Sequence, residues 1–450
     1  MSPSDSPEQA VTADPAVRRR VAVVIALCWL AVFFDGMDVN IYGAVMPHMI
    51  DDHGFGLTTA TAGTIGSWTT FGMLLGALVA GTLTDWLGRR SVVSCCLAVF
   101  SLGSAVCAIA PDPGLFGAGR LVAGLGLGGL MPTCLAIVME FSAPRRRALA
   151  SAVMMTSYHA GGMLATGLGL SLAPAAGWRW VFWAGVIPLV LAVPLVLRHL
   201  PESPVVLLAK GRVAEANAVA RRHGLEPPVP REVPKAGAGG RWQAVLSLFR
   251  PEFRWSTPLL WLASFCGLLL VYGVSTWLPQ LMRASGYGLT SSVSFLLVIN
   301  AGGIVGMFVA GRTATRFGAV RVAAIWFAVT GVGALLMGAH LPLAITYAVV
   351  GLTGVFLFSA QVMAYAALDT VYRPAQRATG LGWAAGVGRL GAVFGPWLGG
   401  LLVSAGNQSW GFTAFAVAGL IGAVAIALIP LARRLGHRPA TTDPTPAPAT

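Results

Sequence analysis

Long apolar segments follow one another along almost the whole chain and leave no room for a water-soluble domain of normal size. Each holds 18 or more predominantly apolar residues, enough for a helix to cross a hydrocarbon core of about 30 Å. Of the 450 residues, 56% are hydrophobic and only 10% are charged, with a mean hydropathy of +0.74. Soluble domains carry roughly 25% charged residues. The sequence therefore predicts an all-α membrane protein.

We predict twelve transmembrane helices, arranged as six helices, a polar linker and six helices. The linker, residues 199–256, is rich in Arg and Pro. Residues 1–20 and 434–450 form polar tails, and residues 21–198 and 257–433 form two six-helix bundles. The predicted spans are residues 21–50, 59–84, 91–110, 114–139, 146–173, 179–198, 257–284, 290–316, 321–339, 342–371, 376–404 and 409–433.

The basic residues are distributed unevenly between the predicted loops. Of the 30 Lys and Arg residues, 26 fall in the tails, the linker and alternate loops, which share one side of the membrane if both termini do. Opposite loops such as 51–53 and 111–113 hold none. This positive-inside pattern predicts a multi-pass inner-membrane protein with both termini in the cytoplasm. The net charge of +13 then reflects topology and requires no nucleic-acid partner.

The two halves of the chain repeat each other at an offset of 230 residues. Tyr42-Gly43 aligns with Tyr272-Gly273 at this offset, and a series of glycines aligns as well: Gly72, Gly76, Gly81, Gly88 and Gly161 with Gly302, Gly306, Gly311, Gly318 and Gly391. Two halves with the same order of spans are typical of secondary transporters, whose substrate site lies near the membrane midplane between the halves.

The repeat fails at the charged positions. Asp35 aligns with Phe265, Asp38 with Leu268 and Asp85 with Thr315, whereas Arg389 aligns with His159. A charge at the bilayer centre costs roughly 2.5–3.5 kcal/mol on insertion scales, so charges within spans normally face a cavity or a partner. We therefore interpret the ionisable side chains inside the spans as functional candidates: Asp35, Asp38, Arg120, Arg389 and His159.

Asp35 and Asp38 are three residues apart and share one helix face. Two carboxylates this close in a low dielectric cannot easily both ionise, so we expect one of them to hold a proton near neutral pH. A carboxyl group that gains and loses a proton in an alternately exposed site is what proton-coupled transport requires. The alternative is that an acid hydrogen-bonds a neighbouring helix or pairs with an arginine.

Two arginines are the candidate cations. Arg389 lies in mid-span among glycines, where its planar guanidinium could bind a substrate carboxylate through two hydrogen bonds. Its alternative role is a permanent ion pair with Asp35 or Asp38. Arg120 lies nearer the outer end of the fourth span and could serve either proton coupling or a structural pairing.

Polar and aromatic residues in other spans are candidates to line the same cavity. Buried amides need partners, which favours Gln361 and Asn300. The aromatic residues could equally be packing residues. The full set of candidate substrate-binding residues is Arg389, Gln361, Trp277, Tyr272, Trp383, Asn300, Tyr158 and His159.

No motif indicates an enzyme, a metal site or a bound cofactor. The two G-x-G-x-x-G segments, at 124–129 and 386–391, lie inside predicted spans and follow no strand, so they favour close helix packing over nucleotide binding. The six cysteines lie in apolar segments without metal-binding spacing. A sensor would need a signalling domain, and the short tails and linker offer none.

Several segments resemble a known family. GTLTDWLGRRSVV, residues 81–93, resembles the signature loop of the major facilitator superfamily. Within it, DGMD (35–38), VYGVSTWLPQLM (271–282), RATGLGWAAGVGRLGAVFG (377–395) and PES (201–203) resemble the aromatic acid:proton symporter family. The resemblance covers roughly residues 20 to 435 and implies the major facilitator fold, with two pseudo-symmetric six-helix bundles.

The resemblance also implies roles for particular residues. Asp35 and Asp38 match the acidic motif of the first span, and Asp85 matches the loop acid that helps the halves change conformation. We expect Asp85 to form a charge latch with two arginines of its loop. The gating loop then comprises Gly81, Asp85, Gly88, Arg89 and Arg90. Thr315 departs from the second loop motif of the family, and Asp369 stands where a small or apolar residue is expected, with Arg373 or Arg377 as a potential partner.

The expected function is import of a small aromatic carboxylate, of the benzoate, hydroxybenzoate, protocatechuate or gentisate type, together with protons. The expected protein is monomeric, sits in the lipid bilayer and needs no cofactor. Two alternatives stay open, namely a transporter of a non-aromatic organic acid and an exporter of hydrophobic compounds.

Overall fold

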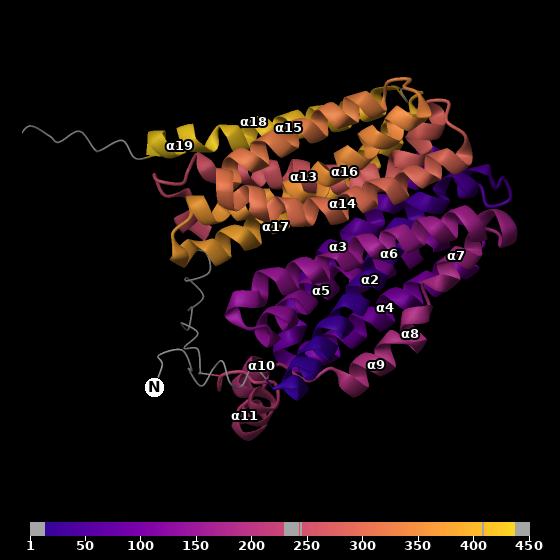
Figure 1. Ribbon diagram of the computed structural model, residues 1–450. Helices are drawn as coiled ribbons and strands as arrows, with labels where there is room; N and C mark the ends of the chain where they lie inside the picture. Colours follow the sequence, from indigo (N-terminus) through magenta and orange to yellow (C-terminus); the bar gives the residue numbers. More distant parts are fainter. Residues whose placement is uncertain (1–13, 229–242, 244, 407–408, 437–450) are drawn as a thin grey trace, which may run out of the picture.

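The computed structural model describes residues 14–228, 243, 245–406 and 409–436, which form helices packed lengthwise into two bundles (Figure 1). Two of the long helices begin at an acid followed by proline. Asp14 accepts a hydrogen bond from the Ala16 N–H at 2.8 Å at the start of α2 (Pro15–Asp51). Asp112 accepts from Gly114 at 2.8 Å at the start of α5 (Pro113–Phe141). Acid caps satisfy free backbone N–H groups, and proline suits the first helical position because it has none to satisfy.

The helices follow the predicted order of six, linker and six. The N-terminal bundle consists of α2, α3 (Thr59–Leu87), α4 (Arg89–Ile109), α5, α6 (Arg147–Ala176), α7 (Trp178–Ala184), α8 (Ile187–Val190) and α9 (Ala192–His199). Two short helices follow, α10 (Pro204–Ala209) and α11 (Val213–Arg222). The C-terminal bundle consists of α13 (Ser256–Ala284), α14 (Leu289–Phe317), α15 (Ala319–Met337), α16 (Leu343–Val371), α17 (Pro374–Ser404), α18 (Ser409–Ala427) and α19 (Ile429–Gly436).

Eleven segments of the described chain are long and apolar enough to cross a membrane. The remaining predicted span, residues 146–173, is present as the 30-residue helix α6, which is rich in Gly, Ala, Ser and Thr. It packs against α2 and α14, so those helices shield much of its less apolar surface. The predicted all-helical, twelve-span architecture is confirmed.

The sixth span differs from the prediction of one continuous helix. It is divided into α7, α8 and α9, with breaks at Gly185 and Leu191. Pro188 and Pro194 lie just after these breaks. Proline has no N–H to donate and crowds the preceding turn, which explains why the helix is interrupted at these points.

Equivalent glycine contacts recur in the two bundles. A Cβ atom at any of these glycines would collide with a backbone carbonyl of the neighbouring helix, so only glycine allows the close approach. The pairs in α3 and α5 are Gly72 with Leu121, Gly76 with Leu125 and Gly124 with Thr69; those in α14 and α16 are Gly302 with Gly351, Gly306 with Val355 and Gly354 with Ile299. All six correspond at the offset of 230, so the repeat extends to tertiary contacts.

The register of the first helix in each half is shifted slightly relative to this offset. Gly161 of α6 packs on the Phe33 carbonyl, and its counterpart Gly391 of α17 packs on the Phe265 carbonyl. Phe33 and Phe265 are 232 positions apart, so Gly267 rather than Phe265 occupies the place of Asp35. The acid of the first helix still has no counterpart in the second half.

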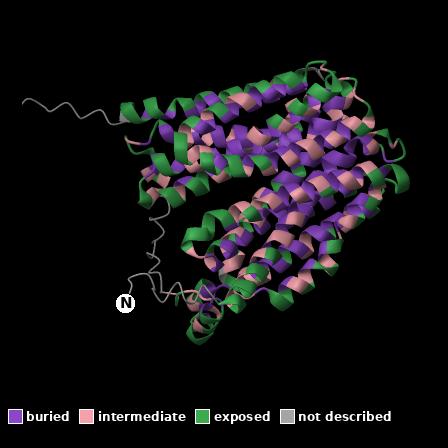
Figure 2. Cartoon of the chain, in the orientation of Figure 1, coloured by how far each residue is buried: buried purple, intermediate pink, exposed green. Residues whose placement is uncertain are grey.

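Buried residues lie mainly where helices face one another, and exposed residues lie mainly on the outside (Figure 2). Large apolar residues such as Leu78, Val190 and Val424 are exposed along the spans. A surface of this kind suits contact with lipid tails. The polar residues that could carry function therefore have to be sought between the helices.

Candidate functional site

Asp38 of α2 is fully paired inside the N-terminal bundle. One carboxylate oxygen lies 2.8 Å from Nη1 of Arg120 on α5, and the other accepts a hydrogen bond from the Ser104 hydroxyl of α4. Arg120 also donates from Nε to the Thr69 hydroxyl of α3 at 3.2 Å. Asp38 and Arg120 are 0% and 1% exposed. The pair joins four helices, and in this state Arg120 is paired with an acid.

Asp35 lies one turn earlier on the same helix in a different environment. It is 1% exposed, and its Oδ1 is buried with no hydrogen-bond partner among the described residues. Arg389 of α17, in the other bundle, is the cation that attracts it most. Nη1 of Arg389 is likewise buried without a partner. A carboxyl group and a guanidinium thus face each other across the bundle interface with unused hydrogen-bonding capacity. The ion pair considered for Arg389 is not formed in this state.

Tyrosines surround this pair of charges. Tyr158 of α6 interacts electrostatically with Asp35, Arg389 and Tyr272 of α13. Tyr272 interacts in turn with Arg389 and with Tyr365 of α16. Tyr158 and Tyr272 are 7% and 9% exposed. The centre of the molecule therefore combines an acid, a guanidinium and three phenol rings from five different helices.

Gly36 explains how Tyr158 comes so close to Asp35. A Cβ atom at Gly36 would collide with the Tyr158 carbonyl, so α6 can approach α2 only because this position is glycine. The glycine between the two acids of DGMD thus positions α6 beside Asp35.

His159 and Asn300 form a hydrogen-bonded bridge between the bundles. Asn300 of α14 lies 3.2 Å from Nδ1 of His159 and donates to Asn40 of α2 at 3.2 Å. Asn40 donates to the Gly36 carbonyl at 2.8 Å. Asn300 and His159 are 0% and 2% exposed. Both predicted residues are therefore engaged with protein groups at mid-depth.

Three other predicted substrate contacts are engaged with protein groups in this state. Trp277 is 0% exposed and donates its N–H to the Pro396 carbonyl at 2.7 Å, so it packs between α13 and α17 in this state. Trp383 stacks on Trp261 with ring centroids 5.6 Å apart. Gln361 donates to the Ser264 hydroxyl at 3.3 Å, and its oxygen packs against Gly267, the structural counterpart of Asp35.

The charged loop after α3 contacts acids of α5 and of the PES turn. Arg89 pairs with Glu140 of α5 at 2.5 Å, and the Arg89 backbone N–H donates to Glu202 at 2.7 Å. Glu202 belongs to the PES turn, where Ser203 also donates to Glu140 at 2.5 Å. The side chain of Asp85 lies outside the described residues. Arg89, one of the two arginines predicted to pair with Asp85, thus contacts Glu140 and Glu202 in this state, and the predicted latch stays a prediction.

The two bundles contact each other at mid-depth and at one end. We call the end that carries Asp51 the far end and the opposite end, next to the linker, the linker end. Arg283 pairs with Asp51 at 2.8 Å. The Ser67 hydroxyl donates to the Val393 carbonyl at 2.7 Å, and the backbones of Gly63 and Gly400 touch. Every described hydrogen bond and ion pair between the bundles lies in these regions. The structure is therefore closed at the far end.

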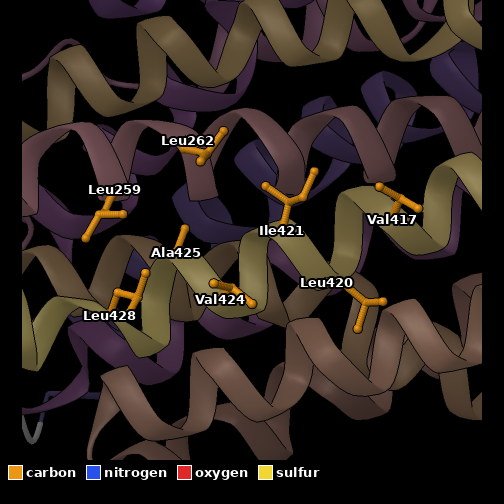
Figure 3. A pocket seen from close by; sticks show the side chains of 8 residues that line it. All are labelled: Leu259, Leu262, Val417, Leu420, Ile421, Val424, Ala425 and Leu428. Carbon is orange, nitrogen blue, oxygen red and sulfur yellow. The ribbon is translucent and has the colours of Figure 1, made fainter.

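The outer surface carries an apolar groove that is separate from this site. It lies between α13 and α18 and is lined by residues such as Leu262, Ile421 and Val424 (Figure 3). It offers no polar side chain, so it suits lipid tails and not a charged ligand. Within the described part of the chain, no cluster of three His, Cys, Asp or Glu side chains could hold a metal ion.

The sequence predictions missed residues that complete these clusters. Ser104, Asn40 and Tyr365 are uncharged residues within predicted spans, and the spacing of the charges gives no sign of them. Glu140 and Glu202 could have been found, since one is an acid at the end of a span and the other lies in the PES turn.

A duplicated bundle with unpaired charges between its halves defines a membrane transporter and not an enzyme. The family model described as "Major Facilitator Superfamily" matches residues 28–313 and 300–450. The gentisate transporter of Corynebacterium glutamicum is 35% identical over 417 residues, covering 92% of this chain and 88% of the relative. The benzoate transport protein of Acinetobacter baylyi is 32% identical, with 90% and 89% covered. The chain belongs to the Major Facilitator Superfamily and, within it, to the aromatic acid transporters.

A solved structure shows the same fold. The partially occluded, inward-open xylose transporter XylE of E. coli superposes with a TM-score of 0.70, covering 92% of this chain and 98% of that one, at 16% identity. This likeness concerns the fold alone.

Proposed function

We propose that the chain is a symporter that couples the import of a small aromatic carboxylate to protons by alternating access. The observation that carries the proposal is the pair of buried, unpartnered atoms, Oδ1 of Asp35 and Nη1 of Arg389, on opposite bundles. Buried polar atoms are costly when they lack partners, so each should gain one during the working cycle. A proton satisfies the carboxylate, and a substrate carboxylate satisfies the guanidinium.

The two binding events depend on each other. An ionised Asp35 attracts Arg389 and competes with the substrate for it. A proton on Asp35 neutralises the competitor and leaves the Arg389 fork to bind the substrate carboxylate. The substrate ring would lie among Tyr158 and Tyr272, whose hydroxyls can bond ring substituents. Release of the proton restores the competing charge and expels the anion, which couples the two fluxes.

Asp38 and Arg120 have a supporting role in this proposal. Their pair is already satisfied by protein groups, so it needs no further partner during the working cycle. Of the two acids, one of which was expected to hold a proton, we therefore propose Asp35 as the proton site and Asp38 as the structural partner of Arg120.

The proposed moving units are residues 21–198 and 257–433, with both termini and the linker in the cytoplasm, as the distribution of Lys and Arg indicates. The far end would then face outward, and the described state would open to the cytoplasm. The cluster of Arg89, Glu140 and Glu202 is proposed to rearrange when the linker ends of the bundles close.

Uptake into proteoliposomes with an imposed pH gradient tests the function. Labelled benzoate, 4-hydroxybenzoate and gentisate should accumulate only when the interior is less acidic, and Arg389→Lys, which keeps the charge but loses the fork, should weaken the apparent affinity at least tenfold. Accumulation of a non-aromatic organic acid in preference to all three would favour the alternative substrate class. Uptake that ignores the pH gradient would contradict proton coupling.

A further inference from the structure

A second cavity, of about 440 Å³, lies between α16 and α17 toward the linker end. Its wall contains Tyr365 and Asp369 from α16 and Arg377, Ala378 and Leu381 from α17. Ligand pockets typically measure about 300–1,000 Å³. The cavity therefore has room for a single-ring compound, and it combines an aromatic ring, apolar side chains and a guanidinium.

Arg377 has unused hydrogen-bonding capacity at this cavity. Its Nε donates to the Tyr372 carbonyl at 3.2 Å and lies 3.9 Å from Oδ1 of Asp369. Its two terminal nitrogens form no hydrogen bond or ion pair with the residues that the structure describes. The side chain is 46% exposed. The outer edge of the guanidinium is thus available to a carboxylate, and Asp369 is only a loosely held counter-charge.

Tyr365 connects this cavity to the central site. It interacts electrostatically with Tyr272, which interacts with Arg389. Arg377 and Arg389 are twelve positions apart on α17, which corresponds to about 18 Å along a helix. Tyr365 thus interacts with the surroundings of Arg389 and also lines the cavity beside Arg377.

The internal repeat shows that packing alone does not require this cluster. Arg147 is the counterpart of Arg377 and makes the equivalent bond, from its Nε to the Ser142 carbonyl at 3.3 Å. At the same offset, however, Asp369 aligns with Met139 and Tyr365 with Leu135. The backbone bond of the arginine is shared by both halves, whereas the acid and the phenol occur only in the half that contains Arg389.

We propose that the cavity at Tyr365, Asp369 and Arg377 is a second, weaker binding site for the transported aromatic carboxylate, occupied as it leaves toward the linker end. The proposal rests on the proposed function. Arg377 binds the carboxylate, Tyr365 contacts the ring, and Asp369 competes for the guanidinium so that the ligand does not remain bound. This role also accounts for an acid at position 369, where the family resemblance led us to expect a small or apolar residue.

Transport from each side of the membrane tests this site. Right-side-out and inside-out vesicles containing the full-length protein would be used to measure the KM for labelled benzoate presented at the far end and at the linker end. Because an exposed ion pair contributes up to about 1 kcal/mol, Arg377→Gln should raise the linker-end KM by about 3–5-fold. The far-end KM should change less than about twofold. Asp369→Asn should act in the opposite direction, lowering the linker-end KM and slowing efflux.

Arg147→Gln is the matched control, because it removes the equivalent arginine from the half without the cavity. It should leave the linker-end KM unchanged. Three results would overturn the second site. They are equal effects of Arg147→Gln and Arg377→Gln on the linker-end KM, equal effects of Arg377→Gln on the KM at both ends, and no effect of Asp369→Asn. Failure of the unsubstituted protein to transport any aromatic carboxylate would instead overturn the proposed function, so the two failures are distinguishable.

Discussion

Asp35→Asn and Asp38→Asn should differ sharply in their effect on stability, although the two acids lie one turn apart. Asp38 is 0% exposed and pairs with Arg120 at 2.8 Å. Its replacement by Asn leaves a buried guanidinium without a counter-charge, and breaking a buried pair in this way typically costs about 3–5 kcal/mol. Asp35 has a buried Oδ1 with no partner. Its replacement removes no ion pair, so the free energy of unfolding should change by less than about 1 kcal/mol.

A double-mutant cycle measures this difference directly. Unfolding of the purified variants in detergent would be followed for Asp35→Asn, Asp38→Asn, Arg120→Gln and the double variant Asp38→Asn/Arg120→Gln. The double variant leaves no unpaired charge, so its loss should be smaller than the sum of the two single losses by at least about 1 kcal/mol. Equal destabilisation by Asp35→Asn and Asp38→Asn, or a cycle without coupling, would refute the division of roles between the two acids.

Three further predictions concern the far end. In Gly63→Leu, a Cβ atom would lie 2.7 Å from Cα of Gly400, so the far end should fail to close. Transport should drop at least tenfold, and distances between spin labels placed across the far end should increase. Arg283→Gln breaks a part-exposed ion pair and should change the free energy of unfolding by no more than about 1 kcal/mol, yet the same distances should shift toward the open state. The hydrogen bond from the Trp178 N–H lowers the pKa of Asp52 from its ordinary value of 3.8. The ionised carboxylate therefore stabilises the folded protein above that pH, and this contribution is lost as the pH falls below it. Trp178→Phe should accordingly reduce the drop in the unfolding midpoint at acid pH.

Much of the fold could be predicted because insertion into lipid depends on local composition. Apolar length located the spans, and the glycines at an offset of 230 located the repeat, since the same close helix contacts recur in both halves. The division of the sixth span was missed because hydropathy averages over Pro188 and Pro194, whose effect is on backbone hydrogen bonding. The two-residue shift of the first helix was also missed, because it depends on which turn of α13 faces Gly391.

The charged residues of the site could be predicted more readily than their partners. A charge within a span is expensive, so Asp35, Asp38, Arg120 and Arg389 stood out from the sequence. The choice of Arg120 as the partner of Asp38 depends on how α2 packs against α5, which spacing along the chain does not determine. The bond of Trp277 to the Pro396 carbonyl could not be predicted for a similar reason, since an aromatic residue in a span can face a cavity or a neighbouring helix with the same local sequence.

The central claim is that Asp35 alone exchanges the transported proton. Its most direct test is substrate-induced proton uptake, followed with a pH indicator inside proteoliposomes, together with exchange of labelled benzoate at equal pH. Asp35→Asn should retain exchange while losing both proton uptake and accumulation against a gradient. Proton uptake by Asp35→Asn at the rate of the unsubstituted protein, with accumulation intact, would contradict the account.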